Sequence, residues 1–104
     1  LVDGKTLDEL VSEIVQWQGE IAPNATPEAA LIHLQEELQE LLWEEDPKRA
    51  AEEAADIFFM LLQYCSRSGI DLRVEVQRKL ATNKARKWEK PDEHGVVRHV
   101  KEAK

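Results

Sequence analysis

Two short acidic motifs lie close together in the sequence, and their spacing suits metal chemistry. The first is an EExxE motif at Glu36, Glu37 and Glu40, and the second is an ExxD motif at Glu53 and Asp56. In a helix, residues three positions apart share a face, so each motif presents a pair of carboxylates to one side. Hard divalent cations such as Mg²⁺ and Mn²⁺ prefer oxygen ligands of this kind. The sequence therefore predicts a metal cup built from two helices.

Helical angles rank the acids of the first motif as ligands. At about 100° per residue, Glu37 lies about 60° and Glu40 about 120° from Leu34, both on the same side of an apolar stripe. Glu36 points away from that stripe. Glu37 and Glu40 are therefore the expected ligands, and Glu36 is the weaker candidate.

In the second motif, the position of Glu53 is the informative feature. Glu53 lies about 40° from Ile57, inside an arc that should be apolar. A buried carboxylate is costly unless it is paired, neutralised or bound to a metal, and Asp56 lies beside it. The alternative is that both motifs are solvated helix faces, since 34% of the residues are charged. The pairing of the motifs favours the metal site.

The pair of motifs resembles that of the MazG-like all-α nucleoside triphosphate pyrophosphohydrolases. This resemblance implies that Glu37, Glu40, Glu53 and Asp56 bind Mg²⁺, with Mn²⁺ as a substitute. It also implies hydrolysis between the α and β phosphates, giving a nucleoside monophosphate and pyrophosphate. The metal would neutralise the phosphates, and Glu37 is the candidate that orients or deprotonates the attacking water.

A later stretch extends the resemblance. The segment KLATNKARKW matches a K-x-x-x-N-x-x-R-x-W pattern whose residues contact phosphates and sugar in that family, which implies substrate binding by Lys79, Asn83, Arg86 and Trp88. The three polar residues are equally compatible with a solvated basic face, and Trp88 with a hydrophobic plug at a helix end. Both interpretations stay open.

Four helical segments are expected to position these residues. Thr6 and Glu9 form a capping box for a helix over 7–20, in which Trp17 belongs to the core or to the wall of a substrate pocket. Asp46-Pro47 ends one helix and begins the next, and this short joint makes the two antiparallel neighbours, with the acidic motifs at similar height. The expected helices are 7–20, 27–45, 47 to Ser68-Gly69, and Asp71 to 87.

The expected fold is all-α, a four-helix MazG-like bundle completed by oligomerisation. Leu, Ala and Glu dominate the composition, and the 104 residues are expected to form one domain with a short C-terminal tail over 89–104. The segment Ile57 to Leu62 is apolar on every side, and this is more apolar surface than one small core layer can cover. A homodimer or homotetramer is therefore expected.

Charge, hydropathy and cysteine content limit where the protein is expected to be located and which partners it is expected to bind. A net charge of −7 argues against binding to a nucleic acid polymer, although a free nucleotide remains compatible. No apolar run is long enough for a membrane span, no signal peptide is visible, and the single Cys65 is expected to be a small buried hydrophobe. A soluble, cytoplasmic protein is expected.

The sequence thus predicts a Mg²⁺-dependent nucleoside triphosphate pyrophosphohydrolase that acts on the nucleotide pool, with deoxynucleotides among its substrates. Two alternatives remain. One is a sibling activity in the same superfamily, a phosphoribosyl-ATP or dUTP pyrophosphohydrolase. The other is a non-catalytic helical interaction module, for which an apolar residue would serve better than Glu53.

Overall fold

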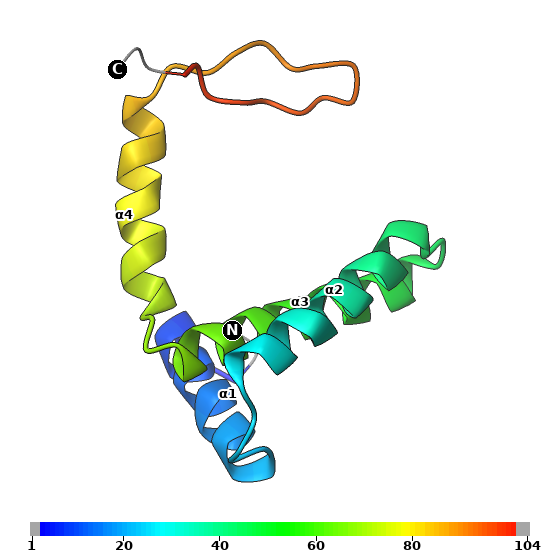
Figure 1. The fold of residues 1–104 in the computed structure, drawn as a ribbon, viewed down its shortest axis with the longest axis vertical. Helices are drawn as coiled ribbons and strands as arrows, with labels where there is room; N and C mark the ends of the chain where they lie inside the picture. Colours follow the sequence, from blue (N-terminus) through cyan, green and yellow to red (C-terminus); the bar gives the residue numbers. More distant parts are fainter. Residues whose placement is uncertain (1–2, 102–104) are drawn as a thin grey trace. The chain divides into compact units, whose positions relative to one another are not determined.

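The protein is described by a computed structural model that covers residues 3–101. These residues form four α-helices, and their only extended pairing is an isolated bridge between Trp88 and His99. The all-α prediction is confirmed. The chain divides into two compact units, the first ending at Leu72 and the second beginning at Arg73. The helices are α1 (Leu7–Ile21), α2 (Pro27–Trp43), α3 (Pro47–Arg67) and α4 (Leu72–Ala85) (Figure 1).

Side-chain caps fix the start of each helix in the first unit, because the first N–H groups of a helix have no partner inside it. The N-caps are Thr6, Thr26 and Asp46, and proline follows the last two at the first helical position. Each cap oxygen accepts a hydrogen bond from the first turn: Glu9 N to Thr6 at 3.1 Å, Ala29 N to Thr26 at 3.2 Å, and Lys48 N to Asp46 at 3.1 Å.

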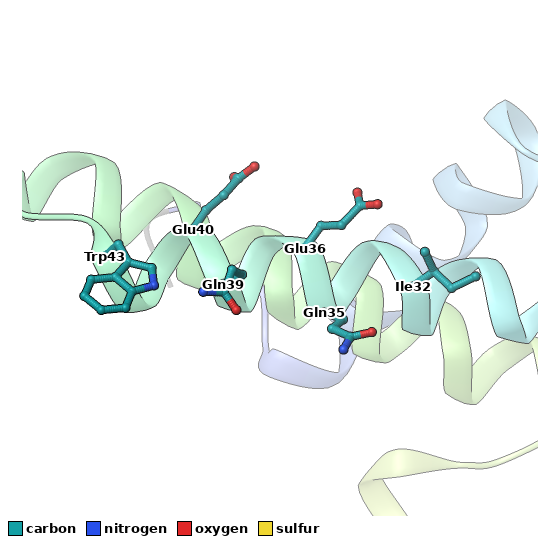
Figure 2. A pocket seen from close by; sticks show the side chains of 6 residues that line it. All are labelled: Ile32, Gln35, Glu36, Gln39, Glu40 and Trp43. Carbon is teal, nitrogen blue, oxygen red and sulfur yellow. The ribbon is translucent and has the colours of Figure 1, made fainter.

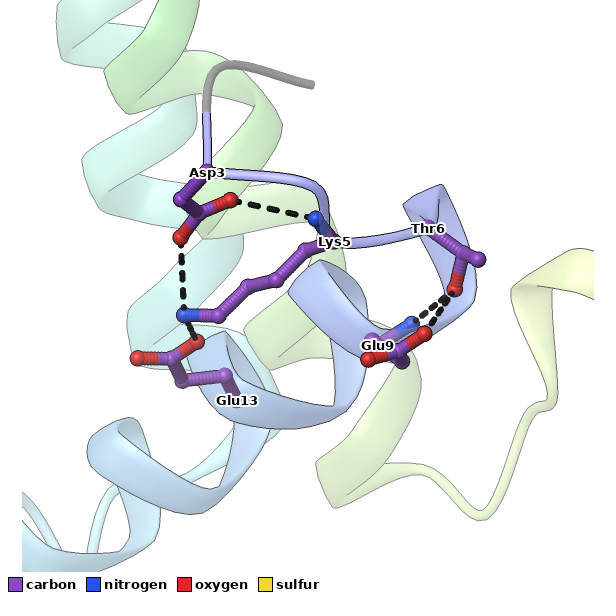
Figure 3. Close-up of polar contacts among 5 residues, drawn as sticks. All are labelled: Asp3, Lys5, Thr6, Glu9 and Glu13. Atoms are coloured by element: carbon purple, nitrogen blue, oxygen red, sulfur yellow. Dashed lines mark hydrogen bonds and ion pairs between the residues drawn. The ribbon is translucent and has the colours of Figure 1, made fainter.

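The predicted capping pair at the start of α1 forms in a variant arrangement. The carboxylate of Glu9 accepts a hydrogen bond from the Thr6 hydroxyl at 3.0 Å (Figure 3). Lys5 pairs with Asp3 and Glu13 on either side, which raises the pKa of Lys5, chiefly through its hydrogen bond to Glu13. The entry to α1 is therefore held by polar contacts alone.

In the first unit, α2 and α3 lie side by side as the antiparallel pair that the Asp46-Pro47 joint predicts, and α1 packs against α3 (Figure 1). The helical spacing of Leu7, Leu10, Ile14 and Trp17 predicts an apolar stripe on α1, which agrees only in part with the buried one. Leu7 and Trp17 are exposed, whereas Ile14 and Gln18 are buried. Cys65 is buried as expected. The fully buried residues of the described chain are Ile14, Gln18, Ala30, Leu62 and Cys65.

The apolar stripe of α2 is only half covered. The helical spacing of Leu31, Leu34, Leu38 and Leu41 predicts that all four face a core. Leu34 and Leu41 are half-buried, but Leu31 is 43% and Leu38 is 52% exposed, so this prediction fails in the single chain. On α3 the same spacing predicts a stripe that includes Ala54 and Ile57, but Ala54 is exposed too. The physical reason is the small number of neighbours, because α1 and α2 make the main contacts with α3 and cover only part of each stripe.

Arg67, at the end of α3, ties that helix to the end of α1. Its guanidinium donates to the backbone carbonyls of Pro23 at 3.0 Å, Ala22 at 2.5 Å and Gln18 at 3.4 Å. These carbonyls belong to the last turn of α1 and the loop after it. Those of Gln18 and Ala22 also accept from Ala22 N and Ala25 N, so the guanidinium is a second donor to each of them. A cation there also suits the negative end of the α1 dipole.

The second unit consists of α4 and a ribbon that doubles back on itself. No residue of α4 is buried. The spacing of Leu72, Val76 and Leu80 predicts an apolar stripe, but Val76 and Leu80 are each 55% exposed. The ribbon turns at Asp92, whose Oδ1 accepts from the N–H groups of His94 and Val96, both at 2.9 Å. Gly95 supplies the positive φ of +78° that this turn needs.

No helix in the part of the chain that the structure describes has the length and the apolar character needed to cross a membrane.

Candidate metal and nucleotide site

The carboxylates of the first motif do not all point the same way. The side chain of Glu37 is 15% exposed and therefore lies against α3, whereas Glu40 is exposed. Figure 2 shows Glu40 projecting from α2 on the same side as Glu36, along an open hollow of about 620 Å³ that also includes Ile32 and Trp43. Glu37 is thus the acid of this motif held closest to the helix pair.

Glu53 is the most perturbed acid of the site. Its Oε2 is covered and has no hydrogen-bond partner among the described residues. Burial raises the pKa of the Glu53 carboxyl above its ordinary value, and the negative charges of Glu44, Glu40 and Glu37 raise it further. Acids of the first motif therefore act on Glu53 across the α2–α3 pair, whereas the predicted grouping of all four ligands stays a prediction.

Glu44 is a site acid that the sequence reasoning missed. It is the C-cap residue of α2, and its Oε1 accepts a hydrogen bond from Asp46 N at 3.2 Å, which places its carboxyl beside that of Glu53. The signal was present, because Glu37, Glu40 and Glu44 follow at i, i+3 and i+7 and so share one helix face. The EExxE motif ends at Glu40 and therefore leaves out Glu44, one turn further along the helix.

A cavity of about 330 Å³ opens beside these acids, at the size of a small-ligand pocket. One part of its wall is apolar and is made by Trp17, Ile21, Phe59 and Met60. Trp17 meets Phe59 edge to face, with ring centroids 6.3 Å apart. Trp17, expected in the core or in a pocket wall, is 48% exposed and lines the cavity. The polar part of the wall is made by Gln18, His33, Glu37, Asp56 and Gln63.

The polar wall brings together one acid from each motif, Glu37 and Asp56. His33 stands one turn before Glu37, with its Nε2 3.2 Å from Glu37 Oε1. This contact restrains the rotamer of Glu37. Glu37 is thus common to both features of the site, since it borders the cavity and its charge acts on Glu53.

The donor set fits a hard divalent cation, although the side chains are not gathered as they stand. Among residues 3–101, no three His, Cys, Asp or Glu side chains lie close enough together to hold a metal ion. Like charges repel one another, so the exposed Glu40 and Asp56 gain by turning to solvent. The covered, unpartnered Glu53 Oε2 is the observation that calls for a cation.

In the second unit, the residues predicted to contact the substrate differ in their exposure to solvent. Lys79 is exposed, whereas Asn83 and Arg86 are half-buried, and Asn83 Oδ1 is covered without a partner among the described residues. The indole N–H of Trp88 donates to the Asn83 carbonyl oxygen at 2.8 Å, and its ring meets that of His99 edge to face. Trp88 therefore closes the end of α4, which agrees with the alternative that it is a plug at a helix end.

Comparison with known proteins gives consistent matches. The family model for dATP/dGTP pyrophosphohydrolase matches residues 10–104. A dATP/dGTP diphosphohydrolase of Cyanophage S-2L is 33% identical over 95 residues, covering 91% of this chain and 89% of the relative. A dATP/dGTP diphosphohydrolase of Salmonella phage PMBT28 is 30% identical over 95 residues, but the match spans only 32% of that longer protein.

One solved structure is similar over almost the whole chain. It is the Cyanophage S-2L MazG-like pyrophosphohydrolase bound to dGDP and three catalytic Mn²⁺ ions per active site. The two folds agree with a TM-score of 0.80 at 29% identity, over 96% of this chain and 98% of the other.

Proposed function

The chain belongs to the dATP/dGTP pyrophosphohydrolase family, and from that premise we propose that it hydrolyses dATP and dGTP to the deoxynucleoside monophosphate and pyrophosphate. It is a nucleotide pyrophosphohydrolase of MazG-like fold that uses a divalent metal. Family membership decides for an enzyme over the non-catalytic helical module. The observation that carries the proposed site is the unpartnered Glu53 Oε2 facing the acids of α2.

Glu37, Glu40, Glu53 and Asp56 are the proposed ligands, with Mg²⁺ as the metal and Mn²⁺ as its substitute. Their oxygens match the preference of both ions. Glu44, beside Glu53, adds negative charge that favours cation binding. When bound, the metal supplies charge neutralisation of the phosphates and activation of water.

Glu37 is the proposed catalytic residue. Its carboxylate borders the cavity and accepts a proton from, or orients, the attacking water. His33 acts through Glu37 as a positioning residue, because its ring holds the Glu37 carboxylate at 3.2 Å. The apolar cavity wall, including Trp17, excludes water from the base side of the site.

The second unit has the charge that a triphosphate requires. Residues 73–104 carry 10 basic and 5 acidic side chains, whereas residues 1–72 carry 4 basic and 16 acidic ones. Lys79, Asn83 and Arg86 follow one side of α4, where we place contacts to the phosphates and the sugar. Trp88 remains a candidate for contact with the nucleotide through the ring edge that its contact with His99 leaves open.

The proposed active form is a homodimer or homotetramer. Large apolar side chains of the helix pair are exposed in the single chain, including Leu38, Leu42 and Trp43 at 52, 70 and 74%. Apolar surface of this extent on a small domain is typical of a protein interface.

A substrate panel tests the function directly. The full chain is incubated with dATP, dGTP, dCTP, dTTP, dUTP or ATP and either Mg²⁺ or Mn²⁺, and the products are separated by chromatography. We expect dATP and dGTP to be turned over fastest, with pyrophosphate as the second product. Orthophosphate together with a diphosphate would contradict cleavage between the α and β phosphates.

Glu53→Gln tests the site within the same assay. The substitution removes the charge while keeping the size, so we expect loss of activity by at least about 100-fold. The matched control is Glu52→Gln, a neighbouring exposed acid on α3, which should retain activity. Equal activity of the two variants would exclude Glu53 as a metal ligand.

A further inference from the structure

Gln18 is a buried amide that the proposed chemistry does not use. Its side chain is 3% exposed, which makes it the one polar residue among the fully buried residues of the described chain. Its Nε2 donates to the Phe59 carbonyl oxygen of α3 at 2.8 Å. Its Oε1 is covered and has no hydrogen-bond partner among the described residues. Half of the amide is therefore satisfied and half is not.

A purely structural role does not explain this arrangement. The Phe59 carbonyl lies inside α3, where Gln63 N is its regular helical partner, so the bond from Gln18 is an additional one. A buried carbonyl oxygen without a partner is costly, and an apolar residue of similar size avoids that cost. The amide is expensive for packing alone, so its oxygen calls for a donor from outside the chain.

The place of Gln18 indicates what that donor is. Gln18 lines the 330 Å³ cavity next to Trp17 and Phe59, at a wall that also includes Met60. An aromatic, largely apolar pocket with one hydrogen-bond acceptor suits a flat ring that carries an N–H on its edge. A nucleobase has both features. The acids Glu37 and Asp56 line the same cavity, so one pocket contains both the amide and two proposed metal ligands.

We propose that Gln18 is a specificity-determining residue whose Oε1 accepts a hydrogen bond from an N–H donor on the edge of a purine base. This inference rests on the proposed function and deepens it. Because Oε1 is covered in the structure, binding includes a rotation of a flexible side chain at the cavity wall, such as Met60 or Gln63. Bases that lack an edge donor are then rejected, because they leave the buried oxygen unpaired.

The test compares dATP with the deoxyribonucleoside triphosphate of unsubstituted purine, which lacks the amino group. We expect the wild type to prefer dATP by roughly 10- to 100-fold in kcat/KM, the usual effect of a buried group left unpaired. Gln18→Met should reduce this ratio to near one. Gln16→Met, the same change at an exposed position of α1, should leave the ratio unchanged. A wild-type ratio near one, or a ratio that Gln18→Met preserves, overturns the proposal.

Two further measurements separate this inference from the proposed function. Calorimetric binding of the two nucleoside diphosphates in the presence of Mn²⁺ gives the same comparison without turnover, and equal affinities would overturn the role of Gln18 alone. Absence of dATP and dGTP turnover would instead contradict the proposed function. If Gln18→Met fails to fold, Gln18→Asn replaces it, since the shorter side chain withdraws the oxygen and should lower the ratio as well.

Discussion

At the scale of single residues, Glu53 has a pKa that the fold raises, so ionising this group costs stability. Burial and the neighbouring charge of Glu44 both disfavour the ionised form, so the pKa of Glu53 is raised in the folded protein. The folded state then holds this proton more tightly than the unfolded state does. The contribution of Glu53 protonation to the free energy of unfolding is therefore fully present at low pH. It is lost as the pH rises through the raised pKa.

The first prediction follows from this linkage. In metal-free buffer, the free energy of unfolding of the wild type should fall relative to that of Glu53→Gln as the pH rises from about 4.5, the ordinary value for this group. Urea unfolding of both proteins between pH 4.5 and 8 measures the difference. Glu52→Gln serves again as the control and should follow the wild type. A constant difference across the range would show that Glu53 is not perturbed.

A polar residue within the apolar arc of a helix is a sign of a buried polar group. This sign identified Glu53 in the sequence but not Gln18. Glu53 was found because it lies in the apolar arc of its helix. Gln18 also lies in such an arc, since Val11, Ile14 and Gln18 follow at i, i+3 and i+7, but the predicted stripe of Leu7, Leu10, Ile14 and Trp17 leaves it out. The unpaired oxygen depends on the contact with Phe59, which sequence periodicity does not give.

At the scale of the helices, the starts and the end of α3 at Ser68-Gly69 were predictable, whereas the ends of α2 and α4 were not. Thr6, Thr26 and Asp46 each cap a helix as expected, because capping is a local property of a few residues. The second helix ends at Trp43 instead of Glu45, since Glu44 is extended and bonds to the joint. The fourth ends at Ala85 instead of Lys87, where Trp88 folds back onto the last turn.

A second prediction concerns the link between α1 and α3. Arg67→Met removes a charged donor from the carbonyls of Ala22 and Pro23 while keeping much of the packing, so the free energy of unfolding should fall by about 1.5 kcal/mol, as is typical for hydrogen bonds to charged groups. Arg49→Met is the control, because its ion pair with Asp46 at 3.8 Å is exposed and contributes little. Equal melting temperatures for the two variants would count against the link.

At the scale of the whole molecule, a single copy leaves much of its apolar surface uncovered. Phe58, from the segment that is apolar on all sides, is 38% exposed. The sequence shows that such a surface exists, because periodicity fails there, but it does not determine which face of which copy covers it. That depends on contacts between chains.

The third prediction tests this assembly. Phe58→Glu places a charge on the uncovered face and should shift the mass in solution toward the monomer, which is 11.9 kDa. Light scattering at micromolar concentration measures the mass, and Ser12→Glu, an exposed change on α1, is the control. A wild type that is already monomeric would contradict the expected dimer or tetramer.

The edge-to-face contact between Trp17 and Phe59 gives the protein an optical reporter of its own. The indole of Trp17 is half exposed at the mouth of the cavity that also contains the unpaired amide. An aromatic ring entering that cavity changes the polarity and the electronic surroundings of the indole, and therefore its fluorescence emission. In a chain in which Trp43 and Trp88 are replaced by Phe, the emission of the unlabelled protein then reports occupancy of the cavity in real time.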